Sequence, residues 1–332
     1  MVVQPVPDPR VIRIDRSLFV NDDCVNGAIA HLADESVDLI VTDPPYGIGG
    51  DRLHQHYNRD ESFVVDGYIE VPAAEYNAFS HGWIRQAERV LRPGGSLYVV
   101  SGYTNLYDVL DALRATSLRE INHLVWKYNF GVYTATKYVS SHYHILYYAK
   151  PGGRRTFNLQ ARFRTDEPHA GGGSANYRDR EDVWTINREY KPGRAKNKNE
   201  LPAALLQKIV QYSSNRDDLV CDFFLGGGST AAVAIGMDRR FAGFEASEQT
   251  FRSRVPLVTA VRPGELLETI AVPEAHAVAN RGKAWTPEDR ARLSSRFADL
   301  CARGLTKTRA IDELAAEWGR GTWSIRRVLK TT

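Results

Sequence analysis

The stretch Val37-Asp38-Leu39-Ile40-Val41-Thr42-Asp43-Pro44-Pro45-Tyr46-Gly47 decides how this 332-residue chain folds. Its apolar run predicts a buried strand, and the two prolines that follow permit neither a helix nor strand pairing. The strand therefore ends at Asp43, which Pro44 holds in an extended conformation. We expect the turn to keep a carboxylate, a proline carbonyl and an aromatic ring in fixed positions. Such a set suits a planar group with an amino substituent, although an ordinary proline-rich turn is the simpler interpretation.

Strands and helices alternate on both sides of this stretch. The expected strands lie at 12–19, 96–101, 121–126, 142–149, 219–221 and 240–244, and the expected helices at 25–32, 72–91, 105–115, 201–212 and 231–237. This alternation predicts an α/β fold with a mostly parallel sheet that is covered by helices on both faces. Residues 47–71 show no sustained period, so we expect a long loop there that acts as a lid.

A second motif, Asp-Phe-Phe-Leu-Gly-Gly-Gly-Ser-Thr, occupies residues 222–230, where a predicted strand gives way to a helix of small residues. Glycines at such a turn let the backbone approach a ligand closely, and a helix N-terminus offers free N–H groups. Glu245 follows the next strand, a position suited to binding ribose hydroxyls. Gly226, Gly228 and Ala231 also match a dinucleotide fingerprint, so this motif alone is equally compatible with a nicotinamide oxidoreductase.

Composition narrows the classes of protein to consider. We expect a cytoplasmic protein, because no apolar run is long enough to span a bilayer and residues 1–15 lack the apolar core of a signal peptide. The three widely separated cysteines predict neither disulfides nor structural zinc. His142 and His144 share one face of a predicted strand, but they lack a third ligand, and we expect no metal.

The net charge of +3 is unevenly distributed along the chain. Residues 151–200 carry 11 basic and 7 acidic side chains and residues 281–332 carry 12 and 6, so these segments contribute +4 and +6 and the remainder −7. Two basic surfaces on an acidic body are typical of a protein that binds a polyanion such as nucleic acid. For either segment alone, a solvated surface is an equally simple interpretation.

Both basic segments are candidates for contact with DNA. Residues 151–198 combine arginines, aromatics and glycines, which suits a target-recognition surface as well as an irregular insertion. Residues 283–332 predict three helices, and the last is suited to lie against DNA, unless this unit is a dimerisation or stabilising tail. The candidate DNA-binding residues are Arg154, Arg155, Arg162, Arg164, Arg178, Arg180, Arg326 and Arg327.

Taken together, the motifs resemble one family. Val41 to Tyr46, with Asn21-Asp22-Asp23-Cys24 before it and Arg89-Val90-Leu91-Arg92-Pro93-Gly94-Gly95 after it, looks like the amino-methylating DNA methyltransferases, which use S-adenosyl-L-methionine. Phe224-x-Gly226-x-Gly228-Ser229-Thr230 resembles their cofactor loop, and Gly243-Phe244-Glu245 resembles their ribose-binding acid. The tetrad Asp43-Pro44-Pro45-Tyr46 precedes the cofactor loop, which resembles the order in the β class of this family. That class is circularly permuted relative to rRNA and protein methyltransferases with a similar tetrad. The resemblance covers about residues 15–255 and implies a Rossmann-like methyltransferase sheet.

The resemblance also implies residue roles. Asp43 and the Pro44 carbonyl would accept the two amino hydrogens of a flipped base, Pro45 would complete the turn, and Tyr46 would stack on the base. Aspartate at the first tetrad position favours N6 of adenine as the target, with N4 of cytosine as the alternative. Residues 197–202 keep only the final proline of the family's His-Pro-x-Gln-Lys-Pro run. The implied cofactor-binding residues are Asp23, Cys24, Asn199, Asp222, Phe224, Gly226, Gly228, Ser229, Thr230 and Glu245.

For the whole chain we predict a methyltransferase domain at 1–262, a linker at 263–282 and a helical domain at 283–332. The helical domain resembles Myb-like helix-turn-helix modules through Gly282-Lys283-x-Trp285-Thr286-Pro287-Glu288 and Trp318-Gly319-Arg320. The expected partner is double-stranded DNA in a prokaryotic nucleoid or a phage-infected cell, with or without a companion endonuclease, and the family allows a homodimer. The alternatives are a nicotinamide oxidoreductase, a non-catalytic DNA-binding regulator, and an RNA or protein methyltransferase.

Overall fold

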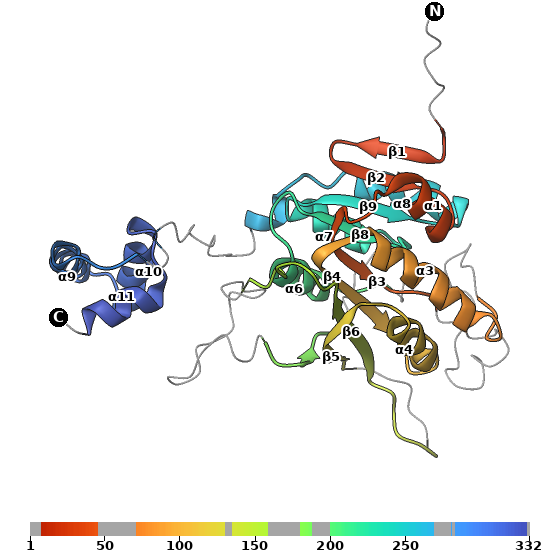
Figure 1. Cartoon of the computed structure of the whole chain (residues 1–332), viewed down its shortest axis with the longest axis horizontal. Helices are drawn as coiled ribbons and strands as arrows, with labels where there is room; N and C mark the ends of the chain where they lie inside the picture. Colours follow the sequence, from red (N-terminus) through yellow and green to blue (C-terminus); the bar gives the residue numbers. More distant parts are fainter. Residues whose placement is uncertain are drawn as a thin grey trace, which may run out of the picture. The chain divides into compact units, whose positions relative to one another are not determined.

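The structure is a computed structural model of the chain, and it describes residues 8–45, 71–129, 135–158, 180–187, 200–268, 280 and 283–330. The chain divides into two compact units, Met1–Ala271 and Val272–Thr332 (Figure 1). The expected lid at 47–71 lies outside the described residues except for Val71, as does most of the expected linker.

One mixed sheet organises the first unit. Its nine described strands lie side by side in the order β1 (Val11–Ile14), β2 (Ser17–Val20), β9 (Arg240–Phe244), β8 (Leu219–Asp222), β3 (Val37–Thr42), β4 (Leu91–Ser101), β6 (His142–Ala149), β5 (Arg119–Lys127) and β7 (Val183–Thr185). The five strands from β2 to β4 pair in parallel, whereas β1 and β6 run antiparallel to their neighbours. The prediction of a mostly parallel α/β sheet is therefore confirmed.

Strand β3 is buried on both faces, which explains its continuous apolar run. Ile40 belongs to a core shared with α1 (Cys24–His31), α3 (Tyr76–Val90) and α4 (Leu106–Arg114). Leu39 and Val41 are fully buried too, and because side chains alternate along a strand they face the other side. There α6 (Ala203–Ser213) contacts β3, and α7 (Ser229–Gly236) contacts α6, β8, β9 and α8 (Glu248–Val258).

The structure corrects two of the predicted elements. Residues 12–19 form two antiparallel strands instead of one edge strand, because Asp15 adopts a left-handed turn conformation with φ of 48°. The expected helix at 72–91 begins only at Tyr76, and β4 follows it directly at Leu91 instead of at Ser96. Leu91 pairs with Val37, and an irregularity in the pairing then takes up the Arg92-Pro93-Gly94-Gly95 run inside the strand.

The second unit contains the three expected helices, α9 (Pro287–Ala302), α10 (Lys307–Glu317) and α11 (Thr322–Leu329). Thr286 caps α9 as predicted, because its hydroxyl accepts a hydrogen bond of 3.1 Å from the Asp289 N–H. The core of the unit consists of Leu293, Leu300, Ala310, Leu314, Ala315, Ile325 and Val328. No described helix combines the length and the hydropathy needed to cross a membrane.

Candidate active site

The turn after β3 lines a pocket, and a tyrosine holds this turn through a hydrogen bond. Thr42 ends the strand, and Asp43, Pro44 and Pro45 follow it and line the pocket. The hydroxyl of Tyr76, a residue that is 1% exposed at the start of α3, donates a hydrogen bond of 2.7 Å to the Pro45 carbonyl. Tyr46, the fourth residue of the tetrad, lies outside the described part of the chain.

A buried hydrogen bond joins this turn to the glycine motif. Thr42 donates to the Asp222 carboxylate at 2.9 Å, across 180 positions of sequence. The two residues meet because β3 and β8 are parallel neighbours, with Ile40 opposite Cys221, so that their carboxyl ends reach the same edge of the sheet. The pairing therefore brings together the two motifs that the sequence keeps far apart.

Two glycines of the loop after β8 lie tightly against neighbouring side chains. Gly228 caps α7 with φ of 79°, and a Cβ there would lie 2.4 Å from the Val258 side chain. A Cβ on Gly227 would lie 2.4 Å from the carboxylate of Glu200. A side chain at position 227 would displace the flexible Glu200 side chain, whereas at position 228 the positive φ also favours glycine.

Glu245 closes the far side of the pocket at the end of β9. Its two carboxylate oxygens accept hydrogen bonds of 2.9 Å from the Gly226 N–H and the Ser247 N–H. Each oxygen keeps a further lone pair for a ligand hydroxyl. Asp23 caps α1 in a similar way, accepting from the Val25 N–H at 2.9 Å.

Burial raises the pKa of two carboxyl groups in the pocket. It raises the pKa of Asp222 to about 7, with a further contribution from the negative charge of Glu245, against hydrogen bonds from Thr230, the Phe224 N–H and Thr42. Burial also raises the pKa of Glu245, although the two N–H donors oppose the shift. The part of the pocket beside Asp222 is therefore less negative than its two carboxyl groups suggest.

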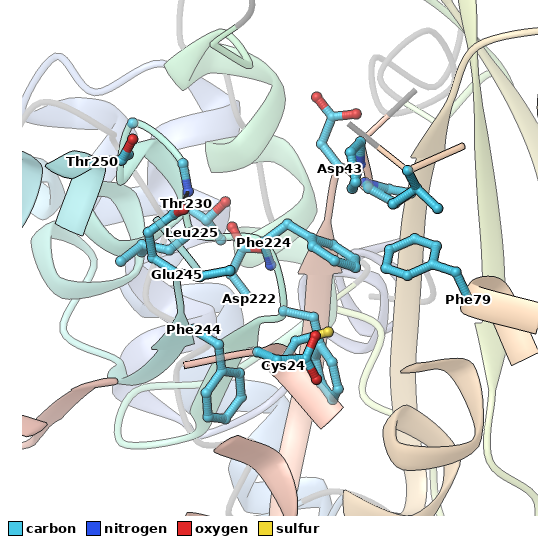
Figure 2. A pocket seen from close by; sticks show the side chains of 18 of the residues that line it. Cys24, Asp43, Phe79, Asp222, Phe224, Leu225, Thr230, Phe244, Glu245 and Thr250 are labelled. Carbon is cyan, nitrogen blue, oxygen red and sulfur yellow. Dashed lines mark hydrogen bonds between the residues drawn. The ribbon is translucent and has the colours of Figure 1, made fainter. Parts of the chain in front are cut away.

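The pocket has a volume of about 610 Å³ and gathers nearly all of the predicted catalytic and cofactor-binding residues that the structure describes. Figure 2 shows Phe224 pointing toward Phe79, and their ring centroids are 5.6 Å apart. Gly228 shapes the loop without lining the pocket, and Asn199 lies outside the described residues. The predicted residues that line the pocket are Asp23, Cys24, Asp43, Pro44, Pro45, Asp222, Phe224, Gly226, Ser229, Thr230 and Glu245.

Several lining residues had not been predicted from the sequence. Thr250 and Arg254 come from α8 at a spacing of four residues, which places both on one face of that helix. Arg254 is the single cation among the described lining residues, and its guanidinium lies 3.9 Å from the Glu200 carboxylate. The helical spacing was visible in the sequence, but nothing local indicated which face of α8 would meet the pocket.

None of the predicted DNA-binding arginines that the structure describes in the first unit lines the pocket. The backbone of Arg154 packs against Gly94 at the amino end of β4, the opposite edge of the sheet from Asp43. Arg155 donates a hydrogen bond of 2.5 Å to the Tyr147 hydroxyl and stacks over Tyr147 and Phe157. Arg180, Arg326 and Arg327 are exposed, whereas Arg162, Arg164 and Arg178 are outside the described ranges.

Comparisons with known proteins agree with this geometry. The model of the N6_N4_Mtase family, described as DNA methylase, matches residues 37–255. The type II methyltransferase M.HpaI of Haemophilus parainfluenzae is 28% identical over 229 residues, which cover 67% of this chain and 68% of the relative. M.BamHI of Bacillus amyloliquefaciens is 30% identical over 250 residues, covering 70% of this chain but only 55% of the relative.

Solved structures share the fold. TTHA0409 of Thermus thermophilus, named as a DNA modification methylase, superposes with a TM-score of 0.52 at 23% identity, covering 73% of this chain and 94% of that one. The PvuII DNA methyltransferase, named as cytosine-N4-specific, gives 0.54 at 15% identity, covering 75% and 86%. Since the family model spans more than half of the sequence, the chain belongs to the N6/N4 DNA methylase family.

Proposed function

We propose that this chain transfers a methyl group from S-adenosyl-L-methionine to the exocyclic amino group of a flipped base in duplex DNA, with N6 of adenine as the favoured target. The observation that carries the proposal is the Thr42–Asp222 hydrogen bond, which joins the Asp43 turn and the glycine loop at one pocket. A methyl donor and an acceptor must meet within a few ångströms for in-line transfer, and this arrangement allows that.

The residues present fit S-adenosyl-L-methionine, which when bound supplies a methyl group activated by a sulfonium. Glu245 has free acceptor capacity for ribose hydroxyls, and Phe224 offers an aromatic face to a planar base. The carboxylates that line the pocket favour a ligand with positive charge, and Arg254 complements the ligand's own carboxylate. The same acidic lining disfavours the pyrophosphate of a nicotinamide dinucleotide.

The turn at Asp43 and Pro44 would make the exocyclic amino nitrogen of the base more nucleophilic. That nitrogen is a poor nucleophile because its lone pair is delocalised into the ring, and pairing hides it inside a duplex. The base must therefore leave the stack. Asp43 and the Pro44 carbonyl would accept the two amino hydrogens and localise the lone pair toward the methyl group. Tyr46 would stack on the flipped base.

The choice between adenine and cytosine belongs to this proposal. Aspartate at position 43 supports adenine, because serine is the usual first residue of the tetrad in cytosine enzymes. The fold allows either base, since the cytosine-N4-specific PvuII enzyme shares it. We extend to this chain the restriction–modification setting of the type II relatives, and a nucleoid location and a homodimer remain proposals.

Replacement of Asp43 tests the assignment. We expect Asp43→Ala to lower the rate of methyl transfer by at least about 100-fold, because a group that stabilises the transition state is lost. Calorimetry should show that S-adenosyl-L-methionine still binds within about threefold of wild type, because the glycine loop and Glu245 are intact. Asp312→Ala, which removes an exposed carboxylate from α10, is the control and should keep full activity. Normal turnover by Asp43→Ala would contradict the proposal.

A further inference from the structure

Helix α11 has one exposed face that is both basic and aromatic. Trp323 is 70% exposed, and the exposed side chains of Arg326, Arg327 and Lys330 follow it by three, four and seven positions. This spacing places all four on the same side of the helix, and we call them the α11 face. The other side of the helix is buried in the core of the unit through Ile325 and Val328, which are 0% and 2% exposed.

Two acidic side chains of this unit, Asp299 and Glu317, form ion pairs with a cation of α9. Arg296 pairs with Asp299 at 2.8 Å and with Glu317 at 3.3 Å, which joins α9 to α10. Helix α11 itself contains no acidic residue. Among the described residues, Arg326 and Lys330 form no ion pair with a carboxylate, so their positive charge faces solvent.

The helix that carries this face is held firmly by the turn before it. Four residues separate α10 from α11, and Gly319 in this turn has φ of 55°. Arg320 is buried, lies 4.5 Å from the ring centroid of Trp285 and donates to the Ala284 carbonyl at 3.2 Å. Trp285 in turn donates to Ser324 of α11 at 3.0 Å. The α11 face is therefore presented by an ordered helix–turn–helix pair.

We infer that the α11 face is a second DNA-binding surface that docks on duplex DNA outside the catalytic pocket. This inference rests on the proposed function, because DNA is the substrate it assigns. Three cations on about two turns of helix complement a line of phosphates, and an α-helix fits the major groove. Trp323, with Arg327 lying 5.5 Å from its ring centroid, adds a flat apolar surface for a sugar or base.

Charge also argues against a second copy of this chain as the occupant. A two-fold contact through the α11 face would bring six cations together without a carboxylate from α11 to pair with them. An apolar protein partner would have to bury the same cations unpaired, which is costly. The phosphates of duplex DNA would neutralise these cations and release counterions. The positive charge that opposes a second copy or an apolar protein therefore favours DNA.

The test measures binding of the full chain to a labelled duplex by fluorescence anisotropy at several salt concentrations. The variant Arg326→Gln/Arg327→Gln/Lys330→Gln removes the three cations, and Lys283→Gln/Arg292→Gln/Arg303→Gln removes the same charge elsewhere in the unit. We expect the first variant to lose roughly 10- to 100-fold in affinity near 0.1 M salt and about two to three in the log–log salt slope. The control should lose less than about threefold.

Trp323→Ala provides an independent readout. Because tryptophan carries no charge, this variant should weaken binding several-fold while the salt slope stays that of wild type. Equal losses in the two triple variants would overturn the inference. So would an α11 variant that changes sedimentation of the free protein and leaves DNA affinity unchanged.

Measurements of methyl transfer separate this inference from the proposed function. At saturating DNA the α11 variant should turn over at the wild-type rate, because the pocket is untouched. A wild-type protein that binds DNA through the α11 face yet transfers no methyl group would contradict the proposed function and support the inference that the α11 face binds DNA. Full methyl transfer by the wild type, together with an α11 variant that binds DNA as tightly as the control variant, would support the proposed function and overturn the inference.

Discussion

Tyr76 matters at the scale of single residues because it holds the backbone that would receive the target base. Tyr76→Phe removes only the hydroxyl that donates to the Pro45 carbonyl at 2.7 Å. We expect the maximal rate of methyl transfer to fall about tenfold, because small misplacements of a reacting group are costly. The dissociation constant of S-adenosyl-L-methionine should stay unchanged. Steady-state kinetics and calorimetry measure both, with Tyr107→Phe on the exposed face of α4 as control. A wild-type rate for Tyr76→Phe would refute this role.

Asp222 should make stability depend on pH. Burial raises its pKa from 3.8 in the unfolded chain to about 7 in the folded protein. The folded state therefore holds a proton that the unfolded state loses, so this contribution to stability is complete below pH 4 and is lost as pH rises through 7. The contribution should fall by roughly 2 to 3 kcal/mol between pH 5 and pH 8.

Asp222→Asn isolates that effect because asparagine does not titrate. Urea denaturation of both proteins at pH 5, 6, 7 and 8 gives the free energy of unfolding in each case. We expect the variant to lose less stability than wild type over this range, so that the two curves converge or cross toward high pH. Parallel curves would show that Asp222 is already ionised at pH 5.

The roles of single residues were only partly readable from the sequence. Asp43, the glycine loop and Glu245 belong to short motifs whose residue types predicted a binding site, and all three meet at the pocket. Tyr76, Thr42 and Arg254 carry no such signal. Their places in and beside the pocket depend on contacts through space, which the spacing of residues along one helix or strand does not specify.

At the scale of elements, the glycine loop depends on α8. A Cβ on Gly228 would meet Val258 at 2.4 Å, and φ of 79° disfavours any other residue. We expect Gly228→Ala to lower the free energy of unfolding by about 2 to 4 kcal/mol, from left-handed strain and overpacking together. Adding Val258→Ala should recover only the packing part. Denaturation of the single and double variants checks this, and a full recovery would mean that the backbone conformation is not strained.

Periodicity predicted most elements but not how they pair. Strand β6 and strand β9 begin and end where the pattern placed them, because apolar runs bounded by polar residues are local signals. The direct passage from α3 into β4 was missed, since proline and two glycines normally end an element. Pairing of Leu91 with Val37 overrides that preference, and it is a long-range contact.

At the scale of the whole molecule, the uneven charge along the sequence predicted two basic surfaces, and the structure describes one of them. The second unit presents its basic α11 face on a packed three-helix core. Most of the other basic region, residues 151–198, lies outside the described residues, and Arg155 within it packs on aromatic rings. Charge counts indicate a polyanion partner, but they do not separate arginines that bind it from arginines that pack.

We propose that this chain methylates an exocyclic amino group of DNA. The most direct measurement incubates the full chain with duplex DNA and S-adenosyl-L-methionine bearing a deuterated methyl group, digests the DNA to nucleosides, and identifies the labelled nucleoside by mass spectrometry. We expect the label on N6-methyladenine. Labelled N4-methylcytosine would contradict the choice of base, and label on a ring carbon, or none above that of Asp43→Ala, would contradict the claim itself.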